Sequence, residues 1–293
     1  MKASKTLPLA LLLASTTAWA EEYSQNFDGF ADGTTDLGDG SFMIGNANVE
    51  PQVFDEQLRL TENTNSNNAA FHIPAMSDSS QGFTVTFDVT MTDTADGTNP
   101  ADGFAFSYGA IPFGTTSPLP EEGWPGTDMV LSFEIDTWDA GSDWGPAVGL
   151  NRPANVGAAG GSNHSSSLGY TSGQIFAEGE SRTVPVTLSW DRGLGASFST
   201  SGFITDANFV NLPTKGFEGD DSYTFAIAGR TGGANEEVLI DNLVITTGVT
   251  DTDGDGMSDA YEINYGLDPE DDGSIDPVLE GADGDFDSDG LSN

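Results

Sequence analysis

Along most of the chain, apolar and polar side chains alternate at every second position. In the segment 83–92, "FTVTFDVTMT", Phe, Val and Met alternate with Thr and Asp. A period of two is typical of a β-strand that buries one face and exposes the other. The same period recurs in "GFAFSYG" (103–109), "DMVLSFEID" (128–136), "TVPVTLSW" (183–190), "SYTFAIAG" (222–229) and "EEVLIDNLVITT" (236–247). Turn residues separate these runs, so residues 21–247 are predicted to form one all-β domain, an antiparallel sandwich or jelly roll.

The first twenty residues follow a different pattern. Lys2 and Lys5 precede a short apolar run, Leu7–Ala14, and "AWA" follows at 18–20. A basic start, an apolar centre and an A-x-A end are typical of a secretory signal peptide. A bilayer span takes about 20 apolar residues, and neither this run nor any later segment is long enough. We expect residues 1–20 to be a signal peptide, and the mature protein to be secreted or at the cell surface without a membrane span.

The chain is strongly acidic, with a formal net charge of −39 and only eight Lys and Arg residues. This charge excludes nucleic acid as a partner, because phosphate binding takes clustered Lys and Arg. It favours cations and neutral ligands instead. The sequence has no Cys, which excludes thiol catalysis and Cys-ligated zinc, and its two His residues do not indicate a histidine metal cluster.

Residues 248–293 differ in composition from the rest, with fifteen Asp and Glu after position 250 and no Lys or Arg. The stretch "DTDGDGMSDAYE" (251–262) matches the D-x-D-x-D-G-x5-E pattern of a calcium loop. The predicted Ca²⁺ ligands are Asp251, Asp253, Asp255, the backbone carbonyl of Met257, Asp259 and Glu262. A short helix is expected over "SDAYEINYG" (258–266), ended by Gly266 and Pro269. The alternative is a solvated acidic linker.

A second loop of the same kind begins at "DFDSDGLSN" (285–293). Its predicted ligands are Asp285, Asp287, Asp289 and Asn293, and its twelfth position would lie beyond residue 293. Either the loop borrows its last ligand or the sequence is a fragment, and we expect a fragment. Together the two loops resemble bacterial relatives of thrombospondin type 3 repeats. The resemblance implies a calcium-ordered spacer in a multidomain extracellular protein.

Three stretches of the front domain carry a second resemblance: "ADGFAFSYG", "LSFEIDTWD" and "FAIAGRTGGANEEVLIDNLVITT". They resemble the concanavalin A-like jelly roll, nearest to L-type lectins and bacterial laminin-G-like modules. The resemblance implies that Asp102, with Gly103 in "ADG", accepts hydrogen bonds from sugar hydroxyls, and that the Ala101–Asp102 peptide bond is cis. It also implies that a loop offers backbone groups to the sugar, formed by Thr231, Gly232, Gly233 and Ala234. Both segments could also be plain turns. Trp138 is a candidate for stacking on a sugar.

Glu134 and Asp136 lie two residues apart, so both are expected on one face of a strand. In the lectins that this chain resembles, such a pair opens a two-metal site. Asp139 and Asp143 could add oxygen ligands, and Trp138 a carbonyl. The chain departs from the family at Ala140, where the lectins have Asn, and in having no His near "PAVGLN" (146–151), where they ligate a transition metal. The sequence therefore leaves two alternatives for this site: it binds a single Ca²⁺, or it binds no metal.

These observations lead first to a secreted, calcium-dependent module that binds an extracellular glycan or cell-surface polysaccharide and is not an enzyme. A second reading is a retaining endo-glucanase, because "EIDTWD" approximates the E-x-D-x-x-E strand motif of bacterial enzymes with this fold. Glu134 would then be the nucleophile, Asp136 would tune it, and Asp139 would be the acid/base. A third reading is a structural matrix or surface component without a small ligand.

Overall fold

The structure is a computed structural model. It describes residues 21–95, 97, 99–112, 130–138, 147–151, 167–214, 217–276, 278, 281–286 and 291–293, with the backbone alone at 147–151 and 167–170.

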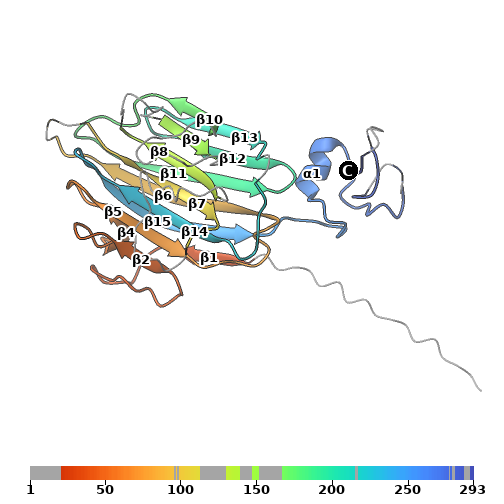
Figure 1. The fold of residues 1–293 in the computed structure, drawn as a ribbon, viewed down its shortest axis with the longest axis horizontal. Helices are drawn as coiled ribbons and strands as arrows, with labels where there is room; N and C mark the ends of the chain where they lie inside the picture. Colours follow the sequence, from red (N-terminus) through yellow and green to blue (C-terminus); the bar gives the residue numbers. More distant parts are fainter. Residues whose placement is uncertain are drawn as a thin grey trace, which may run out of the picture.

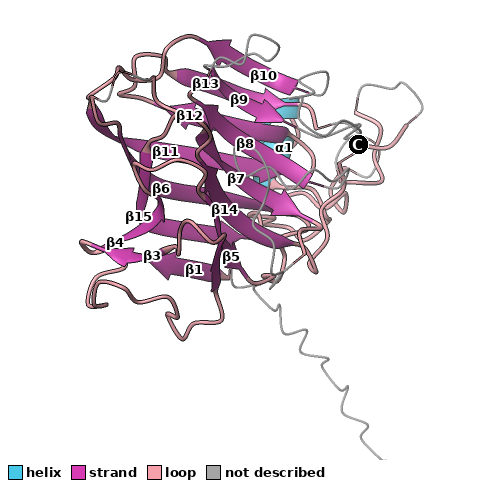
Figure 2. Cartoon of the chain, turned by 60° about the vertical axis from the view of Figure 1, so that its left-hand side comes forward, coloured by secondary structure: helices cyan, strands magenta, loops and turns pink. Residues whose placement is uncertain are grey.

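Among the described residues, fifteen strands form two antiparallel sheets that lie face to face (Figures 1 and 2). The first sheet has the order β13 (Ala207–Leu212), β12 (Gly195–Thr200), β11 (Ser181–Asp191), β6 (Gly82–Thr92), β15 (Glu237–Thr247), β4 (Gln57–Thr61) and β3 (Gln52–Phe54), and β1 (Glu22–Gln25) also pairs with β15. The second has the order β10 (Ser167–Ser172), β9 (Ala147–Asn151), β8 (Val130–Asp136), β7 (Gly103–Gly109), β14 (Thr224–Arg230), β5 (Asn68–Ile73) and β2 (Phe42–Gly45). Strands that follow one another in the sequence often lie in different sheets or are not paired, as in a jelly roll. The predicted antiparallel jelly-roll sandwich is confirmed.

The core lies between the sheets, where the alternating apolar residues of both meet. Phe83 of β6 packs edge-on against Tyr108 of β7 and Phe225 of β14, with ring centroids 4.8 and 5.2 Å apart. Phe133 of β8 stacks on Phe198 of β12 with centroids 3.8 Å apart. These contacts join the two sheets, because each pair takes one ring from either side. The period-two pattern is thereby confirmed as the inward face of each strand.

The outward faces of the two sheets differ. Along β6 and β11 the outward residues are exposed or partly exposed, as the alternation predicts. Along β7 and β8 every residue is buried, so Ser107, Ser132 and Glu134 are buried although they point away from the core. Small outward side chains such as Ala105 and Ser107 accompany this double burial. The expectation that polar residues of these strands face water is therefore wrong for the second sheet.

The acidic tail, defined as residues 248–293, follows β15 and contains one short helix, α1 (Asp259–Tyr265). Ser258 caps its start by accepting the N–H of Tyr261 at 3.2 Å, and Gly266 ends it in the left-handed conformation with φ 84°. Both ends of this helix agree with the sequence prediction. No helix within the described part of the chain is long and apolar enough to cross a membrane.

The tail lies against one end of the sandwich, beside the turn between β11 and β12 (Figure 1). The Ser258 hydroxyl donates a hydrogen bond of 2.7 Å to Asp191, which also accepts the N–H groups of Gly193 and Leu194 at 2.8 and 3.0 Å. The ring of Tyr261 covers Gly193 so closely that a Cβ there would lie 2.6 Å from Cδ2 of the ring. Helix α1 is therefore docked on the sandwich through both polar and packing contacts.

Candidate functional site

Asp102 lies directly before β7, and its backbone is held from both sides. Its N–H donates to the carbonyl of Arg230 at 3.1 Å, and its carbonyl accepts the N–H of Thr137 at 3.1 Å. The Ala101–Asp102 peptide bond is cis, as expected from the sequence. The next residue must be Gly, since Gly103 has φ 124° and a Cβ there would overlap the carbonyl of Ile135. Asp102 is thus fixed where β7 begins and its neighbours β14 and β8 end.

The predicted sugar loop, residues 231–234, follows β14 and is hydrogen-bonded to the loop 62–67. The hydroxyl of Thr231 accepts the N–H of Asn67 at 2.9 Å and donates to the carbonyl of Thr64 at 2.6 Å. The carbonyl of Gly232 accepts the N–H of Ser66, and that of Gly233 accepts the side-chain amide of Asn65, both at 3.1 Å. The Thr231 hydroxyl and the carbonyls of Gly232 and Gly233 are therefore all hydrogen-bonded to residues 64–67 of the connection between β4 and β5. These bonds set the conformation of the sugar loop.

The two segments meet at the Asp102 carboxylate. A Cβ built on Gly232 would lie 3.0 Å from Asp102 Oδ2, so the loop backbone passes directly beside the carboxylate. Arg230 Nε lies 3.4 Å from the same oxygen. The side chain of Asp102 is 12% exposed, and its Oδ2 is buried. The structure thus brings together Asp102 and the loop 231–234, which are about 130 residues apart in sequence.

Glu134 and Asp136 stand at the end of β8 and are buried, with exposures of 3% and 4%. Asp136 Oδ1 accepts the backbone N–H of Trp138 at 3.0 Å, and Trp138 itself is 38% exposed. Ordered carboxylates at a strand end could hold a cation with oxygen ligands. The other residues of this prediction, Asp139 and Asp143, lie outside the described residues, so the full predicted ligand set and the glucanase triad remain predictions.

A further buried acid, which the sequence analysis did not single out, lies behind this site. Glu236 comes directly before β15 and is 0% exposed. Its Oε1 accepts the hydroxyl of Thr137 at 3.1 Å. Burial, and then the charges of Asp102, Asp136 and Asp93, raise the pKa of Glu236 well above its usual value. The signal in the sequence was the doublet "EE" directly before the apolar run "VLI" of β15.

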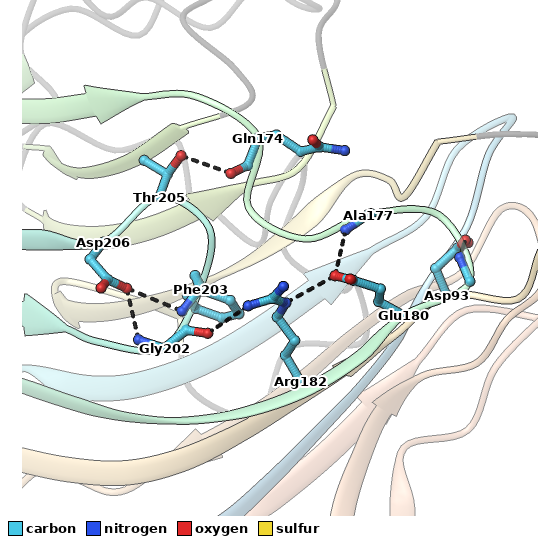
Figure 3. Close-up of polar contacts among 10 residues, drawn as sticks. Asp93, Gln174, Ala177, Glu180, Arg182, Gly202, Phe203, Thr205 and Asp206 are labelled. Atoms are coloured by element: carbon cyan, nitrogen blue, oxygen red, sulfur yellow. Dashed lines mark hydrogen bonds and ion pairs between the residues drawn. The ribbon is translucent and has the colours of Figure 1, made fainter.

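Asp93 belongs to the same acidic surroundings, at the end of β6. Its carboxylate accepts the N–H of Gly179 at 2.8 Å. Figure 3 shows the nearby Arg182 with its guanidinium turned to Glu180, which it meets at 3.0 Å, and to the carbonyl of Gly202, also at 3.0 Å. The charge of Arg182 is therefore paired with Glu180.

The first tail loop places its acids close together, as its pattern predicts. One carboxylate oxygen from each of Asp251, Asp253 and Asp255 lies within 4.8 Å of the others. Backbone N–H groups of the loop support these side chains: Gly254 donates to Asp251 at 2.7 Å and Met257 to Asp255 at 2.8 Å. The loop thus holds three carboxylates together against their mutual repulsion.

Glu262, the last residue of this loop, is carried by α1 and is 0% exposed. Neither of its carboxylate oxygens has a hydrogen-bond partner. Burial, and then the charges of Asp253, Asp255, Asp259 and Asp251, raise its pKa to about 7. A buried carboxylate without partners is costly, and a cation would satisfy both oxygens. This orphaned group therefore fits Ca²⁺ bound by the loop.

The ninth position has the same role in both tail loops. Asp259 accepts the N–H and hydroxyl of Thr252 at 2.7 and 2.8 Å. Seven residues separate this pair, and the same spacing joins Asn293 to the N–H of Phe286 in the second loop, at 2.9 Å. The ninth side chain closes each loop onto its second residue. Asp285 is described as well, whereas Asp287 and Asp289 lie outside the described residues.

Comparisons with known proteins agree with this architecture. No protein-family model and no curated protein matches the chain by sequence. Solved structures do match: basic winged bean lectin with Tn-antigen has a TM-score of 0.57 at 14% identity and covers 78% of this chain and 98% of its own. Peanut lectin with a 9mer peptide has a TM-score of 0.55 at 16% identity, covering 80% and 100%. The exoplasmic/lumenal domain of VIP36, in a Ca²⁺/Man2-bound form, has 0.55 at 13%, covering 80% and 90%. Identities this low establish the fold alone. The chain has the jelly-roll fold of these lectins.

Proposed function

We propose that this protein is an exported carbohydrate-binding module and not an enzyme, with an extracellular glycan or cell-surface polysaccharide as its ligand. The observation that supports the proposal is the meeting of Asp102 with the loop 231–234 at one end of the sandwich. A carboxylate with loop backbone directly beside it is an arrangement suited to the neighbouring hydroxyls of a sugar. The winged bean lectin and VIP36 structures, which have the same fold, are complexes with sugars.

In this proposal, each part of the site has a separate task. Asp102 accepts hydrogen bonds from sugar hydroxyls, and the backbone of Gly232, Gly233 and Ala234 donates to them. Gly233 suits this because nothing lies within 4 Å of the place where its side chain would be. The exposed ring of Trp138 offers a stacking surface close to Asp136.

A cation at the end of β8 would be held by Glu134 and Asp136, whose donor atoms are all oxygen. When bound, it would supply positive charge that neutralises these buried acids. The chain's own contacts already connect this strand end to the sugar site, because Thr137 binds the carbonyl of Asp102. The tail is proposed to bind Ca²⁺ in the loop 251–262 and to serve as a calcium-ordered spacer. In this proposal residues 1–20 are removed on export.

The sugar site is tested on a glycan array with the full mature chain, in the presence of Ca²⁺. Asp102→Asn keeps the size of the side chain but removes the charged acceptor, and we expect it to abolish binding. Asp55→Asn is the matched control, because Asp55 is an exposed turn residue of the other sheet. An array without any bound glycan, or equal binding by Asp102→Asn and the parent, would contradict the proposed function.

The tail site is tested by calorimetric titration with Ca²⁺. Asp255→Ala removes one of the three converging carboxylates, and we expect the heat assigned to the tail to disappear. Glu270→Gln removes a tail charge outside the loop 251–262 and keeps the backbone N–H that donates to Asp268 Oδ1 at 3.2 Å, so it should bind as the parent does. Unchanged heat with Asp255→Ala would reject the calcium assignment of this loop.

A further inference from the structure

A groove of about 940 Å³ runs along β2, which is the last strand of the second sheet among the strands that the structure describes. All four residues of β2 line it, together with the residues 46–52 that follow. The chain turns back sharply after the strand, since a Cβ on Gly45 would overlap the carbonyl of Val49. The volume of this groove lies in the usual range for ligand sites in proteins.

The lining of the groove suits the two kinds of surface that a sugar ring presents. The ring of Phe42 is 37% exposed, and an exposed aromatic ring can stack on the apolar C–H face of a sugar. Hydroxyl and amide side chains, which can donate to sugar hydroxyls and accept from them, come from Thr35, Ser41, Asn46, Asn48 and Gln52. The groove therefore offers both stacking and hydrogen bonds.

The charge of the groove restricts the class of sugar that it can take. Its described lining includes Asp36, Glu50 and Glu62 but no Lys or Arg. Glu62 is paired with Arg59 at 2.8 Å. Uronic acids and sulfated sugars would bring further negative charge to this acidic lining. A neutral glycan would not meet this repulsion.

A single residue, Ser66, joins the groove to the sugar loop 231–234. Its N–H donates to the carbonyl of Gly232 at 3.1 Å, and its carbonyl accepts the side-chain amides of Asn46 and Asn48 at 2.7 and 2.9 Å. Because one residue spans at most about 3.6 Å, the Gly232 carbonyl oxygen and the Asn46 amide nitrogen lie within about 10 Å of each other. Ser66 is exposed, so a ligand can pass over it from the sugar loop to the groove.

We infer that the groove along β2 is an extended subsite of the sugar site, so that the ligand is a neutral oligosaccharide chain and not a single sugar. The inference rests on the proposed sugar site at Asp102 and the loop 231–234, and it specifies the ligand class of that site. One sugar is held at Asp102, the chain crosses Ser66, and further sugars stack on Phe42 and hydrogen-bond to the polar lining of the groove.

The test is a glycan array printed with neutral gluco-, manno- and galacto-oligosaccharides of increasing length, from the single sugar upward, and with oligogalacturonates of the same lengths. We expect the affinity of the full mature chain for a neutral series to rise with length. Phe42→Ala should weaken binding of the longer members by about five- to tenfold and leave the single sugar unaffected, because only the stacking surface is lost. Phe54→Ala is the matched control, since Phe54 is also 37% exposed but lies on β3, at the edge of the other sheet.

A second variant decides the question if Phe42→Ala does not fold. Ala47 is exposed and lines the groove, so the large ring of Ala47→Trp should obstruct the longer chains and spare the single sugar. Parent-like length dependence in both variants would overturn the inference, and so would an equal loss in Phe42→Ala and Phe54→Ala.

The behaviour of the parent protein separates this inference from the proposed function. If affinity does not rise with length while binding of the single sugar still depends on Asp102, the subsite is rejected and the proposed function stands, and the groove is left to another occupant, such as a peptide strand added to β2. Oligogalacturonates that bind as tightly as the neutral series would also overturn the inference. A parent that binds no glycan on the array would reject the subsite and the proposed function together.

Discussion

Gly193→Ala tests whether the docking of the tail on the sandwich and its binding of calcium are linked through α1. Helix α1 carries both Tyr261, which covers Gly193, and Glu262, the buried acid of the calcium loop. A Cβ at position 193 would lie 2.6, 3.2 and 3.3 Å from three atoms of the Tyr261 ring. The backbone of Gly193 is not left-handed, so Ala is conformationally acceptable there and the ring contact is the only conflict.

The size of the effect follows from overpacking. Adding a methyl group into a close contact costs about 1–3 kcal/mol, and since the Tyr261 ring can shift, we expect about 1–2 kcal/mol. If docking and calcium binding share α1, this energy weakens Ca²⁺ binding by about 5- to 30-fold. Calorimetric titration of the full chain measures the change directly. The sandwich itself should melt as before, because Gly193 lies in an exposed turn.

A double-mutant cycle provides the control. Tyr261→Ala removes the ring, so adding Gly193→Ala to it should have no further effect on Ca²⁺ affinity. The two substitutions are then clearly non-additive. If Gly193→Ala leaves the affinity of the parent unchanged, or if its effect persists in the Tyr261→Ala background, the proposed link between docking and calcium is wrong.

Three further predictions concern separate parts of the molecule. Thr231→Val removes the hydroxyl that hydrogen-bonds the sugar loop to Asn67 and Thr64. We expect urea unfolding to show a loss of about 2 kcal/mol in the stability of the sandwich, and the glycan array to show weaker binding. Unaltered stability together with unaltered glycan binding would contradict the role of this loop. Glu262 has an ordinary pKa of 4.5 and a folded pKa of about 7, so without calcium its contribution to tail stability is complete below pH 4.5 and is lost as the pH rises through 7. Limited proteolysis should then find the calcium-free tail more resistant at pH 5 than at pH 8, with Ca²⁺ restoring resistance at pH 8, and equal cleavage at both pH values without calcium would refute this. A chain of residues 21–250 should still melt cooperatively, since the core contacts join strands that all end by Thr247, whereas an insoluble or molten product would contradict the domain boundary.

The sequence predicted the strands that face the core, because alternation reports burial on one side. It failed for the second sheet, where β7 and β8 are buried on both faces and polar residues such as Ser107 and Glu134 do not reach water. Alternation cannot distinguish a solvated face from one that is covered by other parts of the same chain. Small outward residues were the available sign, but they also occur on exposed faces.

The candidate site was predicted where local motifs carry it. Asp102, the loop 231–234 and the first calcium loop lie in short patterns that can be recognised without a structure. Glu236 and the docking pair Ser258 and Asp191 were not found, because their importance comes from contacts across 99 and 67 positions. Such contacts depend on the fold and leave no local pattern.

The measurement that tests the central claim most directly is a crystal structure of the full mature chain with the sugar that binds best on the array. The account predicts sugar hydroxyls within hydrogen-bonding distance of the Asp102 carboxylate and of backbone N–H groups in the loop 231–234. A sugar bound elsewhere on the sandwich, with Asp102 and this loop free of contact, would contradict it.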